Sequence, residues 1–144
     1  MNKPLHCKPR APRQRRGFTL IELAIALVIS VIVLAQAVPS FLSQVRRARR
    51  SDAANAVVAV LQAQERYRSS NAAYSGTLAG IALTAATTSG YYTIALSGAS
   101  ANGYTVTATA SSGRSQSSDS GCSALTVTVA NGSPAYAPTA CWSR

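Results

Sequence analysis

Hydrophobic residues form one long run near the N-terminus of the chain. From Leu23 to Val38 no residue is charged, and extending the run back to Phe18 adds one charge, that of Glu22. A helix of this length rises about 1.5 Å per residue and spans roughly 30 Å, the thickness of the hydrocarbon core of a bilayer. The pattern therefore predicts an apolar helix over residues 18–39.

This run has three competing interpretations. It is too apolar on all sides to be the core helix of a small domain. A secretory signal peptide would explain the basic residues upstream and Ala35-Gln36-Ala37, an A-x-A cleavage pattern, but the run is long for one and contains Glu22. We favour a membrane helix retained in the mature protein. Its Glu22 carboxylate then needs a positive partner, because a charge inside a membrane is costly and the run offers no cation.

The helical pattern continues after the apolar run with a different character. One apolar stripe recurs at spacings of three and four residues: Ala53, Val57, Val60 and Leu61. Side chains of opposite charge three residues apart are neighbours on a helix, so we expect Asp52 to pair with Arg49 and Glu65 with Arg68. The sequence predicts a single helix over residues 18–68, with an apolar first half and an amphipathic second half.

From residue 69 the composition changes to small and hydroxyl-bearing residues. Threonine alternates with apolar residues in segments that predict strands, and these are 91–96, 104–109 and 124–129. Asn131-Gly132 is a tight-turn signal. The segment 111–121 is poor in apolar residues and is expected to be an exposed, flexible loop. Residues 69–144 therefore predict an antiparallel sheet whose apolar face packs on the helix stripe, and the fold class is α+β.

The charge of the chain is strongly positive and unevenly placed. Its 144 residues include fourteen Lys+Arg against four Asp+Glu, a net charge of +10. Six positive residues lie among the first sixteen. A hydrophobic content of 47% excludes a disordered chain, and 12% charged residues is low beside the roughly 25% usual in soluble domains. A basic chain suggests nucleic acid as a partner, but here the longest apolar run separates this basic segment from a second group of arginines between residues 46 and 50.

The segment Arg15-Arg16-Gly17-Phe18-Thr19-Leu20-Ile21-Glu22 resembles the processing site of type IV prepilins and the related type II secretion pseudopilins. The resemblance implies that residues 1–17 are a leader, removed after Gly17 by a prepilin peptidase that also N-methylates Phe18. The new amine at Phe18 is the positive partner that the helix lacked. In this family the glutamate, here Glu22, is thought to pair with such an amine on a neighbouring subunit.

Features of the second half refine the resemblance. Pro39 is expected to kink the helix, and its distance from the cleavage site resembles that of the proline in pilins. Several short matches resemble the PilE-like minor pilins of type IVa pili: Gln64-Glu65-Arg66-Tyr67, Tyr91-Tyr92-Thr93, Gly103-Tyr104-Thr105, Asp119 and Cys141-Trp142. In a segment that leaves the cytoplasm, Cys122 and Cys141 are expected to form a disulfide and not to remain free thiols. Cys7 would leave with the leader.

The second basic cluster consists of Arg46, Arg47, Arg49 and Arg50. One hypothesis is a solvated collar beyond the bilayer, which contacts lipid phosphates or acidic groups of neighbouring subunits. The other is a surface that binds DNA phosphates without regard to sequence. No aromatic residue is interleaved in this cluster, so we favour the collar.

The resemblance implies a structural subunit, a minor pilin that contributes to pilus assembly and to twitching motility, adhesion or DNA uptake. It implies an inner-membrane protein with its head in the periplasm, which then joins an extracellular pilus. The implied partners are other pilin subunits, the prepilin peptidase and the inner-membrane assembly machinery. A type II secretion pseudopilin and a binding domain secreted after Ala37 are the alternatives.

An enzyme is not expected. The only histidine, His6, lies in the leader, and the four acidic residues form no close pair. No nucleophile with a base and no Cys/His metal set is present in the sequence, so we expect no catalytic residue, metal or cofactor.

Overall fold

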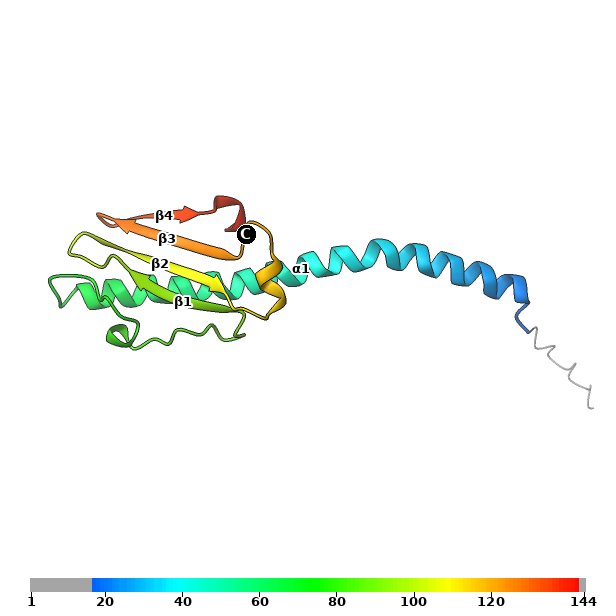
Figure 1. Ribbon diagram of the computed structural model, residues 1–144, viewed down its shortest axis with the longest axis horizontal. Helices are drawn as coiled ribbons and strands as arrows, with labels where there is room; N and C mark the ends of the chain where they lie inside the picture. Colours follow the sequence, from blue (N-terminus) through cyan, green and yellow to red (C-terminus); the bar gives the residue numbers. More distant parts are fainter. Residues whose placement is uncertain (1–16, 143–144) are drawn as a thin grey trace, which may run out of the picture. The chain divides into compact units, whose positions relative to one another are not determined.

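The computed structural model describes residues 17–142 of the chain (Figure 1). Most of the expected leader, with His6 and Cys7, lies outside the described residues. The chain divides into two compact units, residues 1–39 and residues 40–144, and α1 (Leu20–Arg68) runs through both.

In the first unit, α1 is apolar and its large side chains are exposed, Leu20 at 91% and Val38 at 53%. Of the described helices, α1 is the one long and apolar enough to cross a membrane, judged by length and composition. Exposed apolar surface on this scale is unfavourable in water and favourable in lipid or against other apolar helices. The expected long helix is therefore confirmed, although it begins at Leu20 and not at Phe18.

The second unit contains a four-stranded antiparallel sheet in the order β1-β2-β3-β4 (Figure 1). The strands are β1 (Tyr92–Ser97), β2 (Gly103–Ala110), β3 (Ala124–Ala130) and β4 (Ser133–Ala137). The first three lie within two residues of their predicted bounds. The α+β prediction, a helix packed on an antiparallel sheet, is thus confirmed.

The core of this unit lies between the second half of α1 and one face of the sheet. Val57 and Val60 are buried against side chains that alternate along the strands, among them Val106 and Leu125. Threonines occupy the opposite face, where Thr128 of β3 lies opposite Thr105 of β2. The alternation of threonine and apolar residues in the sequence predicts this arrangement, because successive side chains of a strand point to opposite faces.

β4 was not predicted. It follows the tight turn at Asn131 and Gly132, where both residues have positive φ (50° and 77°). All five residues of β4 are exposed. Because neither face of the strand is buried, its sequence lacks the alternation of apolar and polar residues that predicted the other strands. Pro134 is compatible with this position, since β4 pairs with β3 alone and lies at the edge of the sheet.

The connection between α1 and β1 is attached to the helix by Gln64, which is fully buried. Its side-chain amide donates to the Ser75 carbonyl at 2.8 Å, and its amide oxygen accepts from the Ser75 N–H at 2.9 Å. The two bonds satisfy both ends of a buried amide, which would otherwise destabilise the fold. They hold this connection against the last turns of α1.

Candidate functional site

The cleavage and methylation positions predicted from the sequence lie directly before α1. Phe18 is 82% exposed. Glu22 lies in the first turn of the helix, where the helix dipole favours a negative charge. Its N–H donates to Thr19 Oγ1 at 3.2 Å. Sequence reasoning missed this cap, although Thr19 and Glu22 have the spacing of a capping box, which was the available signal.

The four arginines of the second cluster have different environments. Arg50 is paired with Asp119, and Arg49 lies over the ring of Tyr91. Arg47 is exposed and makes no hydrogen bond or ion pair within the described residues. The expected solvated collar is therefore corrected at Arg50, whose charge is paired with Asp119, and contact of the cluster with anions or lipid stays a prediction. No aromatic residue is interleaved with these arginines along the sequence, but in the structure Tyr91 lies against Arg49.

Asp119 belongs to a buried polar network that joins α1, β1 and the connection between β2 and β3. Arg50 Nε donates to its Oδ2 at 2.6 Å, and Gln116 Nε2 donates to the same oxygen at 2.6 Å. Gln116 Nε2 also lies 3.0 Å from the Tyr92 hydroxyl, which donates to the Cys122 carbonyl at 3.1 Å. The hydrogen bond with Asp119 raises the pKa of Arg50, and burial raises the pKa of Tyr92.

This network corrects the prediction of a wholly exposed loop at 111–121. Gln116 and Asp119 are buried, at 0% and 3% exposure, within and directly after the short 3-10 helix Ser115–Ser118. Their composition is that of a solvated loop, but Asp119 is paired with Arg50 of α1, and the Gln116 Nε2 group lies within hydrogen-bond distance of the Tyr92 hydroxyl of β1. Those partners are distant in sequence, so composition alone could not reveal them.

The two ion pairs expected along α1 are also corrected. Asp52 accepts hydrogen bonds from the N–H and the hydroxyl of Ser89, and Glu65 accepts one from the Tyr74 hydroxyl. Partners across the fold have replaced the neighbours on the helix, because an exposed pair at this spacing contributes only a few tenths of a kcal/mol. As a result, Arg49 forms no ion pair within residues 17–142.

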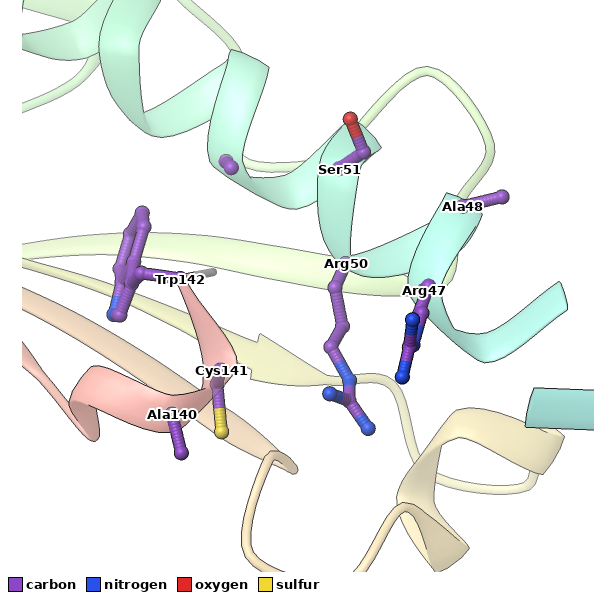
Figure 2. Close-up of a pocket in the computed structure, with 8 residues that line it drawn as sticks. Arg47, Ala48, Arg50, Ser51, Ala140, Cys141 and Trp142 are labelled. Atoms are coloured by element: carbon purple, nitrogen blue, oxygen red, sulfur yellow. The ribbon is translucent and has the colours of Figure 1, made fainter. Parts of the chain in front are cut away.

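A cavity of about 470 Å³ lies beside α1, between the helix and the C-terminal segment of the chain (Figure 2). Arg47, Arg50 and Ser51 line it from the helix, and Cys141 and Trp142 line it from the C-terminal segment. Figure 2 shows the two arginine side chains extending from α1 on the same side. One charge is engaged with Asp119, so Arg47 is the free cation among these lining residues.

Cys122 and Cys141 form the expected disulfide, with a Cα–Cα distance of 5.7 Å. It joins the residues before β3 to the short 3-10 helix Thr139–Cys141. Next to it, Trp142 packs edge-on against Tyr136 with ring centroids 5.1 Å apart. Within residues 17–142 no cluster of three or more His, Cys, Asp or Glu side chains could hold a metal ion.

Two family models match the chain. The prokaryotic N-terminal methylation motif matches residues 12–35. The family described as "Type IV minor pilin ComP, DNA uptake sequence receptor" matches residues 39–126, which is more than half of the chain. No curated protein matches it. The two matched segments are consecutive, and together they extend from the basic N-terminal region to the beginning of β3.

Proposed function

Because this chain belongs to the family described as type IV minor pilin ComP, DNA uptake sequence receptor, we propose that it is a pilus subunit that binds DNA during uptake. The match over residues 39–126 is the observation that carries this proposal. It includes the arginine cluster of α1, which makes DNA uptake a stronger hypothesis than the sequence alone suggested. The role is structural and binding, without catalysis.

Assembly would depend on the N-terminal segment. The methylation motif supports cleavage after Gly17 by a prepilin peptidase and methylation of Phe18. Residues 18–39 would then anchor the protein in the inner membrane, with the head of residues 69–144 in the periplasm, until it joins the extracellular pilus. The Phe18 amine of one subunit would attract the exposed Glu22 of its neighbour. Pro39 would loosen the helix at the end of this segment.

N-terminal sequencing of the mature protein tests this processing. We expect N-methylated phenylalanine, corresponding to Phe18. A mature chain that begins at Val38 would show cleavage after Ala37 and overturn the proposal in favour of a secreted domain. Shearing of the cells provides a second test, because a pilus subunit leaves with the surface fibres. A type II secretion pseudopilin would stay in the envelope.

The arginine distribution supports DNA as the ligand of this protein. Eight arginines follow Phe18, and four of them lie between residues 46 and 50. Neutralisation of DNA phosphates by some of these arginines releases counterions, so such binding weakens as salt increases. The test is fluorescence anisotropy with a labelled duplex and the full mature chain in detergent micelles. We expect binding that decreases with salt, and absence of binding at low salt would contradict the DNA role.

Deletion of the protein would show whether the pilus needs it for twitching motility and adhesion, which pilus membership also implies. Loss of DNA uptake with unchanged motility and adhesion would restrict its role to DNA.

A further inference from the structure

Three distant segments bring two arginines onto one tyrosine. Arg49 of α1 has its guanidinium carbon 3.9 Å from the centroid of the Tyr91 ring, and that of Arg114 lies 5.4 Å from the same centroid. Tyr91 directly precedes β1, and Arg114 lies between β2 and β3. We refer to Arg49, Tyr91 and Arg114 as the Arg-Tyr-Arg cluster.

The positive charges of this cluster are not neutralised by neighbouring carboxylates. The nearest acidic residue along α1 is Asp52, which accepts hydrogen bonds from Ser89. Asp119 is engaged with Arg50. Among the described residues, neither Arg49 nor Arg114 takes part in an ion pair. Two cations held on one ring repel each other, so a shared anionic ligand would be attracted to both.

The geometry prepares the guanidinium groups for phosphate. A guanidinium that lies over an aromatic ring uses its flat face for the ring and keeps its N–H edges available. Arg49 is further held by a hydrogen bond from Nη1 to the Ser115 hydroxyl at 2.5 Å. Groups that are already ordered lose less entropy on binding, and phosphate oxygens accept paired N–H bonds from arginine.

We propose that the Arg-Tyr-Arg cluster contacts the phosphate backbone of DNA, with Tyr91 as a positioning residue for the two arginines. This inference rests on the proposed DNA-binding function and assigns it to one flank of α1. The opposite flank is less suitable. There Arg50 is neutralised by Asp119, which leaves Arg47 as the free cation among the residues that line the cavity.

The test compares DNA affinity across a salt series for the full mature chain in detergent micelles, with a labelled duplex of arbitrary sequence. Arg49→Gln and Arg114→Gln should each weaken binding about three- to tenfold and reduce the slope of log K against log salt by about 0.9. Tyr91→Ala should weaken binding with a smaller change in slope, since no charge is removed. Tyr91→Phe should bind like the wild type, because the ring is retained.

Two arginines serve as matched controls. Arg66→Gln removes the same charge from the last turn of α1, where the side chain makes no aromatic contact or ion pair within the described residues. Arg47→Gln removes it from the opposite flank. Both should change the affinity less than about twofold, since neither removes a direct phosphate contact. Thermal unfolding of each variant shows whether the head remains folded, and the exposed Arg114 is the least disruptive site.

Each outcome is decisive. If the wild type binds and the cluster variants bind equally well, the Arg-Tyr-Arg cluster is not the contact surface while the DNA function stands. If Arg47→Gln has the larger effect, the DNA lies on the cavity flank and the assignment is overturned. Unchanged DNA affinity with weaker binding to phosphatidylglycerol vesicles would assign the cluster to lipid. Absence of DNA binding by the wild type would overturn both proposals.

Discussion

Arg50 and Asp119 form a bidentate ion pair that joins α1 to the connection between β2 and β3. Arg50 Nε donates to Oδ2 at 2.6 Å, and Nη2 donates to Oδ1 at 2.7 Å. The Asp119 side chain is 4% exposed, whereas that of Arg50 is 22% exposed. Pairs of this geometry are stronger than ordinary hydrogen bonds, and this one fixes the loop that also carries Arg114.

We therefore predict that Asp119→Asn destabilises the head by about 2 kcal/mol, because Arg50 loses a charged partner and Gln116 a charged acceptor. Urea unfolding of the full chain in detergent micelles would measure this change. The double variant Arg50→Leu with Asp119→Leu should cost less than the sum of the two single variants, since the pair is removed together. Additive costs would show that the pair is not coupled.

The two most buried tyrosine hydroxyl groups are predicted to respond in opposite ways to removal. The Tyr92 hydroxyl has two hydrogen-bond partners, whereas the Tyr104 hydroxyl has no partner within the described residues. Tyr92→Phe should cost about 1–2 kcal/mol, and Tyr104→Phe should be neutral or stabilising, because it removes a desolvated group that lacks a bond. Equal losses in urea unfolding would contradict this difference.

Alkaline pH provides a separate test of the same residues. Burial raises the pKa of Tyr104 and of Tyr92 above the ordinary value of about 10. The folded state therefore holds these protons more tightly than the unfolded state. The stabilisation is fully present below about pH 10 and is lost as the pH rises toward the folded-state pKa values. Tyr104→Phe should lose less stability than the wild type between about pH 10 and 11.

Gly103 begins β2 where the backbone of β3 approaches closely. A Cβ atom at this position would overlap the Val129 carbonyl oxygen, which belongs to the backbone and cannot rotate away. Gly103→Ala should therefore destabilise the head by about 1–3 kcal/mol. Gly76→Ala is the matched control, since its nearest neighbour would be the Ala99 Cβ at an ordinary 4.0 Å. A comparable loss of thermal stability in both variants would rule out the steric explanation.

Glu22 is predicted to act in assembly and not in membrane insertion. Glu22→Ala makes the segment more apolar, so insertion should be retained. Incorporation into the pilus should decrease several-fold, because the attraction to a neighbouring Phe18 amine is lost. Quantification of the protein in sheared fibres and in membranes measures both effects. Normal incorporation of the variant would refute the charge pair, and Ser30→Ala is a control in the same segment.

The sequence predicted those parts of the fold that depend on local periodicity. Alternating Thr and Val identified β2 and β3, and the spacing of Val57 and Val60 identified the buried helix face. Features that depend on contacts between distant residues were missed. The buried Asp119 carboxylate is paired with Arg50, which lies 69 residues earlier in the chain, and Tyr91 meets the arginines through the packing of distant segments.

The Cys122–Cys141 disulfide has a mechanical consequence when the chain is pulled at its two ends. The bond closes a covalent ring across a sequence separation of 19 residues, and this ring contains β3 and β4. The load on such a chain passes through the sulfur atoms and not through the residues of the ring. The unfolded contour is shortened by about 60 Å, the length that these residues would otherwise contribute at roughly 3.4 Å each. This half of the sheet therefore cannot unravel lengthwise while the bond is intact.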